Sequence, residues 1–401
     1  MSAVVQGALY PAVRPRDIAA YTFSFETPAQ QTRIVAKLEE LLSDLDVGVA
    51  ELKATQKKLA QYRQSLLKAA VEGALTTEWR EERKKDELRK QKETGTPFLP
   101  SSFDASALLQ RILTERRARW EAKQLAKLKE QGKAPPKDWQ KKYPEPVQPD
   151  TANLPELPEG WVWATWSQIG FSQNGRPFPS ADYQDHGVRL LRPGNLLING
   201  AVGWTPKNTR FLKETYAVAN QDLIVGPGEL VINLTAQSLK DDFLGRVCIT
   251  GANEQCLLNQ RIARLSPIMM RADFSHLVFM SPLFRSFVAN LNTGSLIQHM
   301  FTSQIEFFAF PVPPLAEQER IAELVSLGMQ CIEDQARAIE SALKLTTAQR
   351  QNLLRAAFAG QLVPQDPNDE PAGVLLERIR AERAAREAVN KPRGRRAKGA
   401  A

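Results

Sequence analysis

The chain contains one long stretch twice, first as PAQQTRIVAKLEELLSDLDVGVAELKATQKKLAQYRQSLLKAAVEG at residues 28–73 and again as LAEQERIAELVSLGMQCIEDQARAIESALKLTTAQRQNLLRAAFAG at residues 315–360. The two copies align without a gap at an offset of 287 residues, and each ends on a glycine, Gly73 or Gly360. A repeat of this length indicates a duplicated structural unit. The alternative is that two unrelated amphipathic helices happen to align.

Apolar residues recur every seven positions in both copies. In the first copy they are Leu38, Leu45, Leu52, Leu59 and Leu66, and in the second they are Val325, Ile332, Ile339 and Leu353, with Thr346 in the same row. Seven-residue spacing keeps a narrow apolar stripe on one side of a helix, and this is the pattern of coiled-coil packing. Each stripe is too narrow for an independent core, so we expect the two helices to pair with each other and to run antiparallel.

Composition places the chain among ordinary globular proteins. Of its 401 residues, 43% are hydrophobic and 24% are charged, which leaves room for two or three structural units. No apolar run is long enough to span a membrane, and the first residues lack a signal pattern, so we expect a cytoplasmic protein. The three cysteines and three histidines are scattered and indicate no metal site.

The net charge of +8 is unevenly distributed. Residues 74–150 carry a net charge of +5 and residues 361–401 carry +3, whereas basic and acidic residues balance in residues 151–313. A basic excess suggests a polyanionic partner. It does not locate the binding face, because the middle of the chain is neutral.

Residues 155–313 have a different pattern, with short β-like runs such as ELVINLT and GRVCIT separated by glycine and asparagine turns. We predict an α+β protein, in which a compact α/β domain is flanked by two long antiparallel coiled-coil helices. The predicted divisions are a leading segment at 1–27, a spacer helix at 28–73, a charged helical segment and proline-rich linker at 74–154, the compact domain at 155–313, a second spacer helix at 314–360, and a C-terminal helix with a basic tail at 361–401.

Two shorter segments also repeat. Residues 1–27 are weakly similar to residues 294–314 at the same offset of 287, so the chain starts with what looks like the tail of a first domain of the same kind. The alternative is a short irregular leader. The amphipathic segment ASALLQRILTERRARW has a counterpart in VLLERIRAERAARE at residues 374–387, at an offset of 267.

Motifs for catalysis are missing from the sequence. It has no glycine-rich phosphate loop, no strand-borne G-x-G-x-x-G and no G-x-S-x-G elbow. The tetrapeptide Val312-Pro313-Pro314-Leu315 lacks the leading amide of the signature of DNA amino-methyltransferases. We therefore expect a non-enzymatic protein.

The combination of motifs resembles the specificity subunit of type I restriction–modification systems. PPLAEQERI at 313–321, RQNLLRAAFAGQLVPQDPNDEP at 350–371 and LLERIRAERAA at 375–385 are similar to conserved regions of that family. LPEGWVWATW at 157–166 is similar to the start of its target recognition domain. The family alternates two recognition domains with two helical regions, whereas this chain has one domain between two helices, so it resembles a shortened form.

The resemblance implies separate roles for the domain, the paired helices and the partner subunits. The recognition domain reads bases of double-stranded DNA, the paired helices set the spacing, methyltransferase subunits dock on the helices, and a motor-nuclease subunit completes the complex. No cofactor is expected on this chain, because S-adenosylmethionine would bind the methyltransferase. A second copy of the chain is a candidate partner, since one recognition domain reads one half of a bipartite site.

Base readout uses Arg, Lys, Asn and Gln side chains on short loops. The candidate DNA-binding residues are Arg176, Lys207, Asn208, Arg210, Gln237, Ser238, Lys240, Gln260, Arg261 and Gln298. The alternative function is a coiled-coil adaptor whose middle domain binds protein. An adjacent methyltransferase gene would discriminate between the two.

Overall fold

The computed structural model describes residues 14–94, 104–236, 242–291 and 298–389, and the chain divides into two compact units. Unit 1 comprises residues 1–59 and 334–401, and unit 2 comprises residues 60–333. Two helices of 44 residues each, α2 (Pro28–Val71) and α10 (Leu315–Phe358), contribute to both units. Long helices combined with a sheet-containing domain confirm the predicted α+β class.

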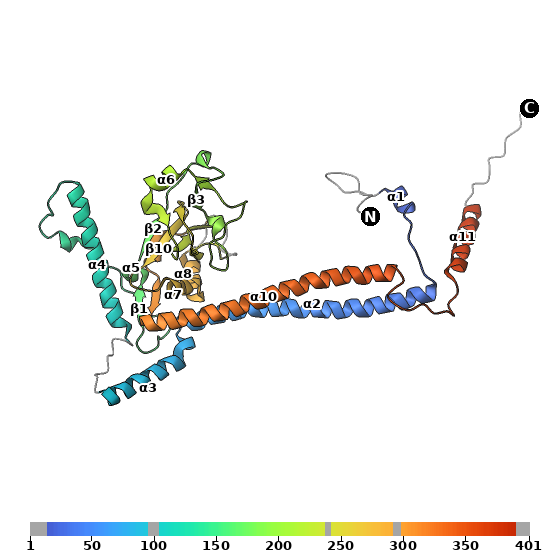
Figure 1. The fold of residues 1–401 in the computed structure, drawn as a ribbon, viewed down its shortest axis with the longest axis horizontal. Helices are drawn as coiled ribbons and strands as arrows, with labels where there is room; N and C mark the ends of the chain where they lie inside the picture. The colour runs from blue at the N-terminus through green and yellow to red at the C-terminus, as the bar shows by residue number, and fades with distance from the viewer. Residues whose placement is uncertain (1–13, 95–103, 237–241, 292–297, 390–401) are drawn as a thin grey trace, which may run out of the picture. The chain divides into compact units, whose positions relative to one another are not determined.

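The secondary-structure elements among the described residues of unit 1 are all helices. It contains α1 (Pro15–Ala19), the first part of α2, the last part of α10, and α11 (Ala372–Val389). The two long helices run antiparallel here (Figure 1). Ser24, just before α2, donates to Phe358 O at the end of α10, whereas Asp46, further along α2, pairs with Arg350, which lies earlier in α10. Leu45 and Leu52 of α2 line a hollow together with Leu353 of α10.

Unit 2 begins with the last turns of α2, which ends at Val71, two residues before Gly73. This glycine has φ +73°, and a side chain there would collide with Pro158 and Trp161. Gly328 of α10 lies against Leu66 of α2, so the two long helices approach closely in this unit as well. The other helices of unit 2 outside the domain are α3 (Thr77–Thr94) and α4 (Ala105–Glu130).

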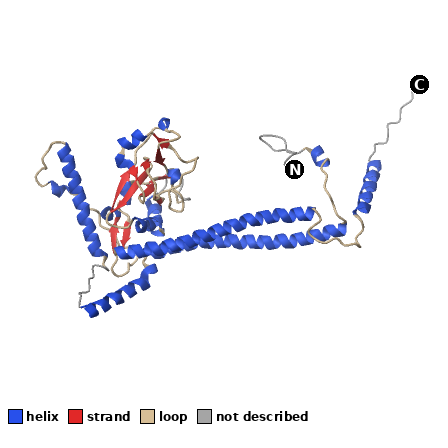
Figure 2. Ribbon diagram, viewed as in Figure 1, coloured by secondary structure: helices blue, strands red, loops and turns tan. Residues whose placement is uncertain are grey.

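Every described strand belongs to unit 2, where the strands form four small sheets (Figure 2). The strands are β1 (Val162–Thr165), β2 (Gly170–Asn174), β3 (Val188–Leu191), β4 (Phe211–Leu212), β5 (Ile224–Val225), β6 (Leu230–Asn233), β7 (Thr235–Ala236), β8 (Val247–Ile249), β9 (Cys256–Leu258), β10 (Ile262–Pro267), β11 (Gln298–His299) and β12 (Ala309–Val312). The helices among them are α5 (Trp166–Ile169), α6 (Glu214–Ala219), α7 (Ala272–Met280), α8 (Pro282–Leu291) and α9 (Thr302–Ile305).

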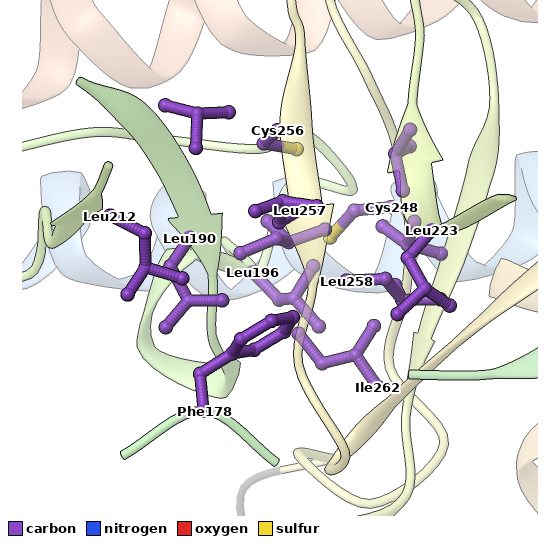
Figure 3. Packing of buried hydrophobic residues seen from close by; sticks show 14 residues of the cluster. Phe178, Leu190, Leu196, Leu212, Leu223, Cys248, Cys256, Leu257, Leu258 and Ile262 are labelled. Carbon is purple, nitrogen blue, oxygen red and sulfur yellow. The ribbon is translucent and has the colours of Figure 1, made fainter. Parts of the chain in front are cut away.

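Two four-stranded sheets make the body of the domain. One has the order β2-β10-β6-β8 and is antiparallel throughout, and the other has the order β4-β3-β9-β5, in which β3 and β9 are parallel. Apolar side chains from both sheets form one buried cluster, in which Leu190 and Leu257 of one sheet pack with Cys248 and Ile262 of the other (Figure 3). This core fixes the loops at the ends of the strands.

The end of the domain closes on its beginning. The last strand, β12, pairs antiparallel with the first, β1, and places Phe310 opposite Ala164. Phe308 and Phe310 enter an aromatic cluster with Phe279, whose ring centroid lies 5.7 Å from each of theirs. The closing segment of α9 and β12 is therefore an integral part of the domain's core.

Glu317, in the first turn of α10, joins three segments of unit 2. Its Oε1 accepts a hydrogen bond from Thr76 Oγ1 at 2.6 Å and an ion-paired one from Arg80 Nη1, and its Oε2 accepts one from Trp161 Nε1 at 2.9 Å. The next residue, Gln318, accepts from the backbone N–H of Arg271 at 3.0 Å. Because Glu317 and Gln318 are both buried, these bonds seat the domain on the start of α10.

Candidate nucleic-acid interface

Strand register brings several candidate residues to one end of the β4-β3-β9-β5 sheet. The parallel strands β3 and β9 finish level with each other, since Leu191 pairs with Leu258. β4 runs the opposite way and begins at this end, because the N–H of Leu190 donates to the carbonyl of Arg210 at 2.8 Å. We call this end, with the loops 174–176, 192–195, 205–210 and 259–261, the basic end of the domain.

The loop 205–210 presents two cations and holds its own shape through Asn208. The amide of Asn208 accepts from Thr205 N at 2.6 Å and donates to Gly194 O at 2.9 Å. Arg210 donates to Thr209 O at 2.6 Å, and Lys207 is exposed. Asn208 therefore organises the loop in this structure, whereas Lys207 points its charge to the surface.

Arg176 lies beside the end of β9. Its N–H donates to Leu258 O at 3.2 Å, and its carbonyl accepts from Gln260 N at 2.9 Å. The exposed guanidinium forms an ion pair with Asp222 at 3.4 Å and a hydrogen bond with Asn220 at 3.1 Å. An exposed pair of this kind contributes little to stability, so Arg176 remains available to exchange Asp222 for a phosphate.

Gln260 and Arg261 follow directly and have exposed side chains. The carbonyl of Arg261 accepts from Leu234 N at 2.9 Å, which links this loop to β7. β7 in turn pairs with β11, with Ala236 opposite Gln298. The backbone of Gln298 therefore lies beside β7, which follows the contact with Arg261. Gln237, Ser238 and Lys240 lie outside the residues that the structure describes.

The basic end also contains Arg192, which sequence reasoning missed. It follows β3 directly, and its guanidinium lies over the ring of Tyr183 at 5.7 Å. The signal was available, because Arg192-Pro193-Gly194 marks the turn that ends a buried strand. Arg192, Lys207, Arg210 and Arg261 have no carboxylate partner among the described residues.

Most other cations of the domain are occupied in holding it together. Arg264 pairs with Glu229 at 3.3 Å, and Arg189 pairs with Glu254 at 3.5 Å. Arg285 donates to the carbonyl of Leu244 at 2.9 Å, and burial lowers its pKa to about 10. Lys213, which lacks a carboxylate partner in the described chain, lies at the opposite end of β4. The domain is neutral overall, but Arg192, Lys207, Arg210 and Arg261, which have no carboxylate partner in the described chain, all lie at the basic end.

Two cysteines and one histidine of the domain, Cys248, Cys256 and His276, are buried. Desolvation raises the pKa of the Cys248 and Cys256 thiols to about 12, so both stay protonated near neutral pH. Desolvation lowers the pKa of His276 to about 4, so its ring stays neutral. No group of three metal-ligating side chains occurs among the residues described. The arrangement is suited to binding a polyanion.

The residues predicted to pair the helices are all buried or partly buried. Leu66, Val325, Ile332 and Ile339 are buried, and the partly buried ones are Leu38, Leu45, Leu52, Leu59 and Leu353. Apolar residues outside the seven-residue rows are left exposed on the same helices, for example Val47 and Leu327. No helix in the described ranges is long and apolar enough to cross a lipid bilayer.

Comparison with known proteins gives one consistent result. The chain is 22% identical over 391 residues to the specificity subunit of the type I restriction enzyme EcoDI of Escherichia coli, which covers 95% of this chain and 73% of that protein. It is 29% identical over 233 residues to the EcoAI specificity subunit of E. coli, covering 56% of this chain but only 35% of that one.

A solved structure described as the HsdS subunit from Thermoanaerobacter tengcongensis matches with a TM-score of 0.45 and 17% identity, over 90% of this chain and 67% of that one. No family model matches the chain.

Proposed function

We infer that this chain, a homologue of the specificity subunits of type I restriction enzymes, is the non-catalytic subunit that selects the DNA sequence in a restriction–modification complex. The observation that supports a DNA-reading role is the basic end of the domain. Four cations without carboxylate partners in the described chain, Arg192, Lys207, Arg210 and Arg261, gather there on loops held by strand ends.

Their chemistry suits the two tasks of DNA recognition. Lysine and arginine contact phosphates and fix the register of the protein on the duplex, and arginine also forms bidentate hydrogen bonds with guanine in the major groove. Gln260, next to Arg261, has the side chain that pairs with adenine. We propose that these loops enter the groove, with Asn208 shaping one loop from within.

The partners follow from the same proposal. DNA methyltransferase subunits would dock on α2 and α10 and bring S-adenosylmethionine, and a motor-nuclease subunit would complete the complex. The exposed apolar side chains of the long helices, among them Val47 and Leu327, offer contact area for them. Such a complex acts on DNA inside the cell, so it would work in the cytoplasm.

The test uses the complex assembled with its methyltransferase subunits. Lys207→Ala combined with Arg210→Ala should leave the chain folded but weaken binding to the cognate duplex, and each lost phosphate contact should reduce the salt slope of binding by about 1. Lys213→Ala, at the opposite end of β4, is the matched control and should bind as the unaltered chain does. Unchanged affinity of the double variant across the salt series would remove the loop 205–210 from the interface.

A further inference from the structure

The positive charge of residues 74–150 is concentrated in one part of unit 2. The second half of α4 and the loop that follows it, residues 120–143, contain seven lysines and three carboxylates. We call residues 120–143 the basic hairpin, because the chain leaves along α4 and returns beside it (Figure 1). The loops of the basic end, which are proposed to read DNA, include none of these residues.

Three aromatic side chains hold the basic hairpin in shape. The indole of Trp139, in the returning loop, stacks on that of Trp120 of α4 with ring centroids 5.7 Å apart, and Tyr143 meets Trp120 edge-on at 5.4 Å. Gly132, with φ +62°, follows the end of α4 in the left-handed conformation that terminates helices. The loop is therefore packed against the helix, and its lysines have a defined position.

Both ends of the basic hairpin are fixed to the domain. On the outgoing side, Ile112 of α4 is 0% exposed, and Arg116 Nη1 donates to Gly170 O at 2.9 Å. On the returning side, Thr165 Oγ1 donates to Val147 O at 2.6 Å. Because these contacts join α4 and the returning chain to the same domain, the hairpin is a fixed projection of that domain.

Most lysines of the basic hairpin are free of ion pairs. Lys141 pairs with Asp138 at 3.4 Å. The other six are exposed and have no carboxylate partner among the described residues, and they are Lys123, Lys127, Lys129, Lys133, Lys137 and Lys142. Lys123 and Lys127 lie four residues apart and so on the same face of α4. Ammonium groups gathered in this way repel one another, and a polyanion along the hairpin would relieve the repulsion.

The side chains of the basic hairpin suit a nucleic acid better than a protein. Protein interfaces are depleted of lysine and enriched in aromatic residues at their core. In the hairpin, Trp120 and Trp139 are partly buried against each other, and the lysines are on the outside. An ammonium group on a flexible stem is a point charge that binds phosphate, and phosphate contacts position a protein on DNA without reading the bases.

The basic hairpin begins close to the basic end of the domain. Arg116 contacts Gly170, the first residue of β2, and the chain continues from β2 to Arg176. Gly170 and Arg176 are six residues apart in the sequence, so they lie at most about 21 Å apart. From Arg116 to its end at Glu130, α4 rises about 21 Å, which is the length of about six base pairs. A duplex bound at the basic end can therefore reach the hairpin.

We propose that the basic hairpin binds the phosphate backbone of duplex DNA beside the recognition sequence and reads no bases. The inference rests on the proposed function, which supplies the duplex, and it adds a second DNA-contacting surface to this chain. The basic end selects the sequence, and the hairpin extends the contact along the flanking DNA and adds affinity that depends on salt.

The experiment uses the complex with its methyltransferase subunits and two fluorescent duplexes. One duplex ends with the recognition sequence, and the other extends it on each side by about 10 base pairs of random sequence, which exceeds the length of the hairpin. Lys123→Gln combined with Lys127→Gln and Lys133→Gln should leave binding to the short duplex unchanged. On the extended duplex, the slope of log K against log salt should become shallower by about 0.9 for each lost phosphate contact, and so by about 2.7 for all three.

Two further variants make the result specific. Arginine at the same three positions of the hairpin should keep the slope of the unaltered chain, because arginine also binds phosphate. Glutamine at Lys53, Lys57 and Lys58, which are exposed on α2, removes the same charge and should leave binding to both duplexes unchanged.

Equal slopes of the hairpin glutamine variant and the unaltered chain on the extended duplex overturn the inference. If Lys207→Ala with Arg210→Ala still weakens binding to both duplexes, the proposed function survives that result. An equal loss on the short duplex would place the hairpin at the recognition sequence and overturn the inference, and so would an equal change in the α2 variant. Release of a methyltransferase subunit from the hairpin variant without DNA would identify a protein as its partner and overturn it too.

Discussion

Glu317 links more segments of unit 2 through hydrogen bonds than the exposed glutamates near it do. Its carboxylate is buried and accepts hydrogen bonds from the side chains of Thr76, Arg80 and Trp161. Replacing it with alanine would leave the largely buried Arg80 without its counter-charge, and losing one partner of a buried pair costs about 3 kcal/mol or more.

We therefore expect Glu317→Ala to lower the free energy of unfolding of unit 2 by about 3 kcal/mol, measured by hydrogen exchange of the domain amides. Glu323→Ala is the matched control, because Glu323 is exposed and its ion pair among the described residues is with Arg320 of its own helix, at 3.2 Å. The control should change stability by less than about 0.5 kcal/mol. Equal effects of the two variants would contradict the role of Glu317.

His276 makes the stability of the domain depend on pH. The ring lies buried on α7, where Nε2 is 3.2 Å from Val247 O, and desolvation lowers its pKa from 6.5 to about 4. Between these values the unfolded chain binds a proton that the folded chain does not. The stability from the neutral ring is complete above pH 6.5 and is lost as the pH falls toward 4.

We expect the loss to be about 1.4 kcal/mol per pH unit between pH 6 and 5. The measurement compares thermal unfolding of the domain in the unaltered chain and in His276→Gln, which has no titrating ring. The stability difference between the two proteins should shrink as the pH falls. Parallel pH profiles would show that His276 does not titrate on unfolding.

Single residues also show where sequence reasoning about the site reached its limit. It placed Lys207 and Arg210 on a loop of the domain, and their role in DNA binding stays a prediction. It could not assign Asn208 to the inside of the loop, because that depends on the carbonyl of Gly194 fourteen residues away. Arg192 was missed although its turn was visible. Whether a cation is paired depends on tertiary contacts, such as Arg264 with Glu229, that no local pattern reveals.

At the scale of elements, the two glycines inside the long helices have different surroundings. A side chain at Gly48 would meet no atom within 4 Å, whereas one at Gly328 would lie 2.7 Å from Cδ2 of the buried Leu66. Alanine in a helix interior is favoured over glycine by about 1 kcal/mol. We expect Gly48→Ala to gain that amount and Gly328→Ala to gain less, because Leu66 must turn away.

Urea unfolding followed by circular dichroism would compare the two alanine variants with the unaltered chain. Equal stabilisation by both would mean that the close approach of α2 and α10 at Leu66 is not tight in solution. The predicted helices, 28–73 and 314–360, overlap α2, Pro28–Val71, and α10, Leu315–Phe358, and the seven-residue rows indicated both. Contacts at the helix ends, such as the hydrogen bond from Trp161 to Glu317, depend on residues far away in the sequence and could not be predicted from the rows.

The apolar rows of the long helices give a prediction about pairing. Leu45 and Leu52 line the hollow that α2 and α10 share in unit 1. Leu45→Asp combined with Leu52→Asp would bury two charges there, which should separate the helices and release a methyltransferase partner that docks on them. Lys53→Asp with Lys57→Asp, on exposed positions of α2, is the control. Co-purification of the partner with the leucine variant at the unaltered yield would argue against docking.

At the scale of the whole molecule, most of the predicted fold was inferred from the internal sequence repeat. The offset of 287 indicated both long helices and the weak similarity of residues 1–27 to residues 294–314, since pattern alone indicates duplicated elements. It could not predict that Ile18 and Phe23 would be exposed while Ile305 and Phe310 are buried. Burial belongs to the assembled unit, and unit 1 has no described body for these side chains to cover.

The distribution of charge over the chain leads to a prediction about salt. The chain carries a net charge of +8, but residues 155–313 contain 12 basic and 12 acidic residues. We therefore expect DNA contacts there to depend mainly on Arg192, Lys207, Arg210 and Arg261, the four basic-end cations without a carboxylate partner in the described chain. Each neutralised phosphate contributes about −0.9 to the slope of log K against log salt, so four contacts give a slope of about −3.6. Replacing Arg192 and Arg261 with alanine should halve that slope, measured by fluorescence anisotropy with a labelled duplex. Lys213→Ala should leave it unchanged, and a slope that the basic-end variants do not alter would place the DNA on another surface.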